Sequence, residues 1–128
     1  MIVPLLLSCT KEKQSNPLID TKWEVWSITA PDRDFIIISP APYLITFKND
    51  NIYNMRFDVN SCGSTYKIDD ENLIDIEPIY CTEICCDKPF ADTLRNVLII
   101  VKSYKITGED LELIAPNRII NLTKINDD

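Results

Sequence analysis

Five cysteines carry most of the chemistry available to this 128-residue chain, which has no histidine and only two glycines. Four of them stand in the body of the sequence, at Cys62, Cys81, Cys85 and Cys86. Four thiols can form two disulfides in an oxidising compartment, hold a metal as thiolates, or act in redox catalysis where a helix start lowers a thiol pKa. The paired Cys-x-x-Cys motifs of tetrahedral zinc sites are missing, so we expect structural disulfides and no metal.

Four cysteines allow three disulfide pairings. A bond between the neighbours Cys85 and Cys86 needs a strained eight-membered ring, so we do not expect the pairing that contains it. Two pairings remain open: Cys62 with Cys86 and Cys81 with Cys85, or Cys62 with Cys85 and Cys81 with Cys86. Either bond from Cys62 closes a loop of about 25 residues and would stabilise the fold by roughly 3 to 4 kcal/mol.

The fifth cysteine, Cys9, follows an apolar N-terminal run, Ile2 to Leu7. The run ends in the sequence LLSC, which is typical of the cleavage site of a lipoprotein signal peptide. We therefore expect residues 1–8 to be a signal peptide and Cys9 to be lipidated at the mature N-terminus. The leader lacks the usual positive charge before its apolar run. The alternatives are a cytosolic protein with a frayed apolar N-terminus, or a short buried strand at Ile2 to Leu7.

We then expect residues 9–17 to be the lipidated cysteine and a polar tether, and residues 18–125 to form one folded domain. The longest later apolar run, Val97 to Val101, has five residues, far fewer than the ~20 that span a bilayer. The membrane is therefore expected as a partner only through the N-terminal lipid. Because Thr10, and not an aspartate, follows the lipidated cysteine, we expect the outer membrane of a bacterial cell envelope.

Composition argues against several classes of function. A formal net charge of −7, with basic residues scattered singly, offers no stripe for a phosphate backbone, so nucleic acid is not an expected partner. The absence of histidine excludes His-dependent triads, and two glycines cannot build a phosphate-cradling loop. We expect no catalytic residues and no cofactor.

Short apolar and β-branched runs, separated by turn residues, predict a mostly antiparallel sheet of about eight strands. The predicted strands are residues 22–28, 43–47, 52–57, 65–68, 73–76, 104–106, 111–114 and 119–123. The polar stretches 48–51 and 69–72 predict hairpin turns, which accounts for the acidic residues Asp69, Asp70 and Glu71 without a calcium site.

One segment, about residues 89–102, follows a helical period instead. Its apolar stripe consists of Phe90, Leu94, Val97, Leu98 and Val101. Pro89 suits the first helical turn, and Asp87 and Asp92 complement the positive end of the helix dipole. The fold class is therefore α+β with a single amphipathic helix.

Two tryptophans lie in the first predicted strand. Trp23 and Trp26 are three residues apart, so they point to opposite faces of a regular strand, and one of them should point away from the core. The loop Phe35 to Ile38 is the segment available to cover it.

The domain also carries an ordered series of short motifs. An apolar residue and a turn precede a tryptophan, an asparagine precedes a tyrosine strand, a threonine is followed four residues later by a cysteine, and a helix and a final hairpin close the series. The residues concerned are Trp23, Asn60, Tyr66, Thr82 and Cys86, then Tyr104, Gly108, Leu111 and Leu113. From about Leu18 to Leu122 this order resembles the META domain (HslJ-like) proteins of bacterial envelopes. One departure is that Val59 stands where the family usually has a cysteine.

The resemblance implies a compact, barrel-like antiparallel sheet with one helix, frequent lipid anchoring and no established catalytic residues. It also favours the pairing of Cys62 with Cys86 and of Cys81 with Cys85, because Cys86 matches the family's cysteine. The expected function is a non-catalytic binding or structural module that supports envelope integrity or a stress response and contacts an envelope protein or the cell wall. The alternatives are a small thiol-redox or metal-binding protein that uses the four cysteines, and an inhibitor-like binder of a secreted partner.

Overall fold

The computed structural model describes residues 16–32, 34–84 and 86–126. The expected signal peptide, the lipidated Cys9, most of the tether and the pairing of Cys85 lie outside these residues. The described elements, in chain order, are β1 (Thr21–Thr29), β2 (Ile36–Ile38), β3 (Leu44–Phe47), β4 (Ile52–Arg56), β5 (Ser61–Ile68), β6 (Ile74–Ile76), β7 (Tyr80–Cys81), α1 (Pro89–Leu98), β8 (Ser103–Thr107), β9 (Asp110–Ala115) and β10 (Arg118–Ile125).

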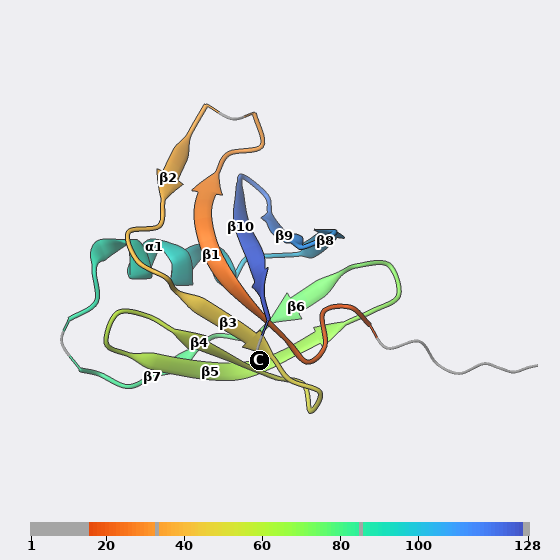
Figure 1. The fold of residues 1–128 in the computed structure, drawn as a ribbon, viewed down its shortest axis with the longest axis horizontal. Coiled ribbons are helices and arrows are strands. Elements are labelled where there is room, and N and C mark those ends of the chain that lie inside the picture. The colour runs from red at the N-terminus through yellow and green to blue at the C-terminus, as the bar shows by residue number, and fades with distance from the viewer. Residues whose placement is uncertain (1–15, 33, 85, 127–128) are drawn as a thin grey trace, which may run out of the picture.

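The strands form one antiparallel sheet that curls into a nearly closed barrel (Figure 1). The main path runs β6-β5-β4-β3-β1-β10-β9-β8, while β2 pairs with β1 and β7 pairs with β5. The two ends of the path meet, because Ile74 N–H donates to the Lys102 carbonyl at 2.9 Å and Tyr104 N–H donates to the Asn72 carbonyl at 3.0 Å. The predicted barrel-like α+β fold is confirmed.

Turn residues of the expected kind connect the hairpins. Asn51 between β3 and β4, Asn72 between β5 and β6, and Gly108 between β8 and β9 all have φ between 62° and 67°. Asparagine and glycine tolerate this left-handed conformation better than other residues do. The predicted turns 48–51 and 69–72 are therefore confirmed as hairpin connections.

Aromatic side chains fill the barrel, and their polar atoms find partners. The Tyr53 hydroxyl donates to the Glu77 carbonyl at 2.9 Å, and the Tyr66 hydroxyl donates to the Lys48 carbonyl at 2.6 Å. Burial raises the pKa of Tyr66 to about 12 and raises that of Tyr53 further. Trp23 is 1% exposed and donates through its indole N–H to the Thr21 hydroxyl. These satisfied groups let polar aromatics occupy the core without an unpaired donor.

Helix α1 packs its apolar stripe against the barrel near β9 and β10. The residues buried from the helix are Phe90, Ala91, Leu94, Val97 and Leu98. The helix ends at Leu98, four residues before the predicted boundary, because the chain tightens into a turn. Ile100 N–H donates to the Val97 carbonyl and Val101 N–H to the Leu98 carbonyl, and Lys102 then pairs with β9. Val101 is still buried, so the periodicity identified its burial but not its conformation.

Two short strands were not expected. The segment predicted as a loop, Phe35 to Ile38, contains β2, which pairs with the second half of β1. Strand β7 has two residues and follows Pro78. Neither is long enough to show an alternating pattern, and both are formed by pairing with a longer neighbour.

Candidate binding groove

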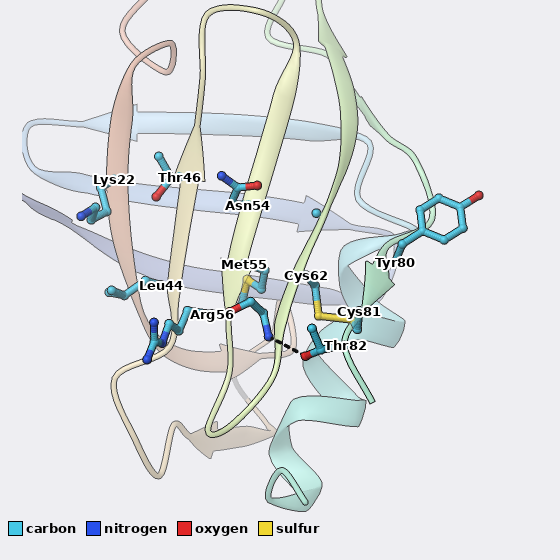
Figure 2. A pocket seen from close by; sticks show the side chains of 12 residues that line it. Lys22, Leu44, Thr46, Asn54, Met55, Arg56, Cys62, Tyr80, Cys81 and Thr82 are labelled. Carbon is cyan, nitrogen blue, oxygen red and sulfur yellow. Dashed lines mark hydrogen bonds between the residues drawn. A yellow bond between two sulfur atoms is a disulfide. The ribbon is translucent and has the colours of Figure 1, made fainter. Parts of the chain in front are cut away.

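The outer face of β1, β3, β4 and β5 carries a groove of about 730 Å³, with β7 at one side (Figure 2). Strand register explains which side chains line it. Lys22 in β1 is opposite Thr46, which is opposite Asn54, which is opposite Gly63. In the same way Leu44 is opposite Arg56, which is opposite Ser61. Because side chains alternate along strands, both rows face outward while Trp23 and Ile45 between them point into the core.

Gly63 forms part of the groove's floor. A Cβ atom at this position would lie 3.0 Å from Asn54 Oδ1 and 3.2 Å from the Tyr53 carbonyl oxygen. The absence of a side chain at Gly63 therefore leaves room for the Asn54 side chain, which lies over this part of the sheet. Asn54, beside it, offers both amide donors and a carbonyl acceptor.

Two cationic residues, Lys22 and Arg56, line the groove, and the residues described by the structure contribute no aspartate or glutamate to it. Figure 2 shows both cationic side chains toward the β1–β3 side of the groove, Lys22 beside Thr46 and Arg56 beside Leu44, with the Tyr80 ring projecting outward at the opposite side. A second hollow of about 380 Å³ shares Lys22 and Thr46 with the groove. That second hollow adds Lys48, Lys124 and the acidic Asp20.

A disulfide between Cys62 and Cys81 ties β5 to β7 at the side of the groove. Both partners expected for Cys62, Cys86 and Cys85, are therefore wrong. The physical reason is register: Cys62 and Cys81 face each other across the antiparallel β5–β7 pair, with their Cα atoms 4.0 Å apart. The expected pairings were obtained by excluding a strained bond between Cys85 and Cys86. That argument does not consider which cysteines face each other across paired strands. Cys86 is also disulfide-bonded.

The motif residues Asn60 and Thr82 meet in a hydrogen-bonded cluster beside the groove. The Asn60 amide nitrogen donates to the Ile84 carbonyl at 2.8 Å and to Asp87 Oδ2 at 2.6 Å. Its amide oxygen accepts from the Thr82 hydroxyl at 2.7 Å and from Ile84 N–H at 2.8 Å. All four hydrogen-bonding positions of this buried side chain are used, so it fixes the segment after β7 to the start of β5.

Asp87 completes this cluster instead of capping the helix. Its Oδ1 accepts from Val59 N–H at 2.8 Å and from Asn60 N–H at 3.3 Å, while the helix N-cap is Lys88. Desolvation raises the pKa of Asp87, but the hydrogen bonds from Asn60 and from the two backbone N–H groups outweigh it and lower the pKa overall. Asp92 does lie in the first helical turn, as expected.

A parallel cluster holds the helix start. Asp58 Oδ2 accepts from the Tyr43 hydroxyl at 2.5 Å and from Lys88 N–H at 2.8 Å, and Asp58 Oδ1 pairs with the Lys88 ammonium at 3.2 Å. Desolvation raises the pKa of Asp58, but these hydrogen bonds and the Lys88 charge lower it overall. Sequence reasoning did not single out Asp58 or Tyr43, because an acid after a strand is usually a solvated loop residue.

The second tryptophan lies on the surface away from the groove. Trp26 is 58% exposed and occupies a β-bulge where the register of β1 against β10 shifts between Val25 and Ser27. The segment that was available to cover it pairs beside it as β2, and Ile36 and Ile38 are themselves about 60% exposed. The expected opposite orientation of Trp23 and Trp26 is thus confirmed.

In the part of the chain that the structure describes, no group of three or more cysteine, aspartate or glutamate side chains is placed to hold a metal ion. Over the same residues, no helix has the length and apolar character needed to cross a membrane.

Comparison with known proteins places the fold. The family model described as the META domain matches residues 16–124. An NMR structure of a protein from Burkholderia xenovorans is similar with a TM-score of 0.71 at 12% identity, covering 95% of this chain and 100% of that one. A crystal structure of a DUF4847 family protein from Bacteroides vulgatus has a TM-score of 0.65 at 14% identity, covering 88% and 97%. No curated protein sequence matches significantly.

Proposed function

Because the chain belongs to the META domain family, we propose that it is a non-catalytic binding module, lipid-anchored in the bacterial cell envelope. The observation that carries the proposal is the groove on the outer face of the sheet. Its residues come from paired strands of the barrel, so their backbone positions are fixed before a ligand arrives. Charged groups, hydroxyls and an amide in a rigid setting suit recognition of a polar ligand.

The proposed location in the cell envelope rests on the sequence at the N-terminus. The LLSC motif ending at Cys9 supports lipidation there, and Thr10 supports sorting to the outer membrane. Residues 10–17 would then connect the lipid to the domain. At no more than ~3.6 Å per residue, such a tether would keep the barrel within roughly 30 Å of the bilayer surface.

The test is the intact mass of the protein from envelope membranes, expressed with its upstream leader and compared with the Cys9→Ser variant. The expected result is a mass that includes acyl chains, lost in the variant together with membrane association. An unmodified mass, or a Cys9→Ser variant that stays in the membrane, would refute the anchor.

The inhibitor-like alternative has one specific observation in its favour. The hairpin of β1 and β2 presents Trp26, Ile36 and Ile38 to solvent, and it extends beyond the rest of the sheet (Figure 1). Large exposed apolar side chains on a projecting hairpin are typical of a surface that docks on another protein. This function would be favoured by one tight partner that co-purifies with the protein and is lost in a Trp26→Ser variant.

A further inference from the structure

We propose that the surface around Trp26 docks a basic segment of a partner protein, with arginine side chains on the Trp26 ring and paired with nearby carboxylates. These carboxylates belong to Glu24, Asp110 and Glu112. The surface is separate from the groove, because the two share no lining residue within the described part of the chain. The inference rests on the proposed binding function and names a partner chemistry for its inhibitor-like alternative.

Trp26 is a large aromatic side chain that the fold leaves uncovered. It is 58% exposed, whereas Trp23 on the same strand is 1% exposed. With the described residues, its side chain makes no hydrogen bond, ring contact or cation–π contact. The face of a tryptophan ring is the best aromatic platform for a cation, and arginine occupies such faces more often than lysine does.

Trp26 lines two hollows. One, of about 270 Å³, lies over β9 and β10, and the other, of about 360 Å³, lies toward the segment 38–42 after β1. Alternate side chains of an extended chain point to the same side, roughly 7 Å apart. A segment that crosses the Trp26 ring can therefore place one side chain in each hollow.

Strand register brings acidic side chains to both hollows. Glu24 is opposite Thr123, which is opposite Asp110, and in the next row Asn121 is opposite Glu112. Neighbouring strands are about 4.8 Å apart, so these rows lie close to one another on the sheet. Glu24 lines the hollow near segment 38–42, while Asp110 and Glu112 line the hollow over β9 and β10.

The three carboxylates are not neutralised by the fold. Among the described residues, no lysine or arginine lines either hollow. None of the three acids forms an ion pair or a side-chain hydrogen bond with a described residue. Lys105 is opposite Glu112 in the β8–β9 pair, but it does not line the hollow. A guanidinium in either hollow would meet both an aromatic face and a carboxylate.

Charge also distinguishes a basic segment from other occupants of an exposed aromatic surface. A second copy docked through the same patch would bring the same three carboxylates against one another, because a two-fold interface uses one surface twice. The formal net charge of −7 repels anionic head groups and nucleic acid as well. A cationic protein segment has the complementary charge, and the negative field attracts it.

The experiment is calorimetric titration of the full chain, purified in detergent at low salt, with the peptide acetyl-Gly-Arg-Gly-Arg-Gly-amide. One matched probe has citrulline in place of both arginines, which keeps the shape and removes the charge. The other probe is spermidine, which is cationic but has no peptide chain. We expect the arginine peptide to bind, the citrulline peptide to bind at least roughly tenfold more weakly, and spermidine to bind more weakly than the arginine peptide.

Each other outcome would contradict the proposal. No binding of the arginine peptide, or equal binding of the citrulline peptide, would overturn it. Equal or tighter binding of spermidine would overturn the assignment to a protein segment. Analytical ultracentrifugation of the protein alone addresses the second copy: a dimer that Trp26→Leu dissociates would overturn the assignment to a basic partner.

Variants locate the site. Trp26→Leu keeps an apolar side chain and should weaken binding of the arginine peptide about two- to fivefold. Neutralising the three acids together should weaken it by roughly tenfold or more, in the variant Glu24→Gln, Asp110→Asn, Glu112→Gln. The matched control removes the same charge from exposed residues outside both hollows, in the variant Asp70→Asn, Glu71→Gln, Glu83→Gln.

Thermal unfolding would establish that all three proteins are folded. Unchanged affinity in Trp26→Leu or in the acid variant, or an equal loss in the control, would refute the site. The result is independent of the anchor and of the groove. A missing lipid leaves the titration unaffected, and a failed titration leaves the lipid mass and the groove unchanged.

Discussion

A single amide side chain connects two separate stretches of this protein, the start of β5 and the segment 82–87 that leads to the helix. Asn60 accepts and donates four hydrogen bonds while it is 7% exposed, and each partner loses its own bond if the side chain is truncated. We expect Asn60→Ala to lower the free energy of unfolding by about 2 to 4 kcal/mol, measured by urea denaturation. The matched control is Asn121→Ala, because the Asn121 side chain makes two hydrogen bonds and not four, both to hydroxyls, those of Ser27 and Thr29. If the two variants lost the same free energy of unfolding, the special contribution of the four Asn60 hydrogen bonds would be contradicted.

The acids that anchor the helix start make stability depend on pH. The folded-state pKa values of Asp58 and Asp87 are lowered, so their contribution is fully present above the unfolded pKa of about 4. It is lost as the pH falls through the lower folded values. We expect the urea midpoint to drop on acidification below about pH 4, and a doubly substituted Asp58→Asn, Asp87→Asn protein to drop less steeply. An identical pH dependence of the two proteins would argue against this linkage.

Among the elements, the β5–β7 pair depends on its covalent bond. Strand β7 has two residues, and the Cys62–Cys81 bond closes a loop with a sequence separation of 19. Replacing both cysteines by serine should destabilise the protein by roughly 3 kcal/mol through the greater freedom of the unfolded chain. Urea denaturation without reductant provides the measurement. Native protein treated with reductant should lose at least as much, and a double variant as stable as the native protein would show that the bond is dispensable.

Helix α1 depends on its buried stripe. Leu94 is fully buried, so Leu94→Asp places an unpaired charge in the core and should abolish cooperative unfolding. Asn96→Asp is the control, because Asn96 is exposed on the same helix and gains the same charge. Near-ultraviolet circular dichroism distinguishes the outcomes. A native spectrum for Leu94→Asp would mean that the helix does not complete the core.

The longer elements could be predicted from the sequence, and the shortest ones could not. Strands with several alternating residues and hairpins with asparagine or glycine turns were predictable, because their signals lie within a few neighbouring residues. The groove was not, since Lys22, Thr46, Asn54 and Arg56 resemble the polar outer face of any solvated strand. Only the register between strands brings them together. The disulfide partner of Cys62 could not be predicted for the same reason, because β7 forms only by pairing with β5.

At the scale of the whole molecule, the sheet joins the beginning of the domain to its end. Strand β1 pairs with β10 along most of its length, from Lys22 opposite Ile125 to Thr29 opposite Ile119. Contacts between residues so far apart in the chain bring a large loop-closure cost before they form, which slows folding. We therefore expect β1 to pair with β10 late in folding.

That order of events bears on how the protein is made. A ribosome releases β10 only after every other described strand has emerged, so the barrel cannot close until β10 has been made. Until then the edge of β1 that pairs with β10 stays without this partner. A domain whose first and last strands pair with each other therefore leaves an open sheet edge, which other strands can pair with, until its last strand has been made.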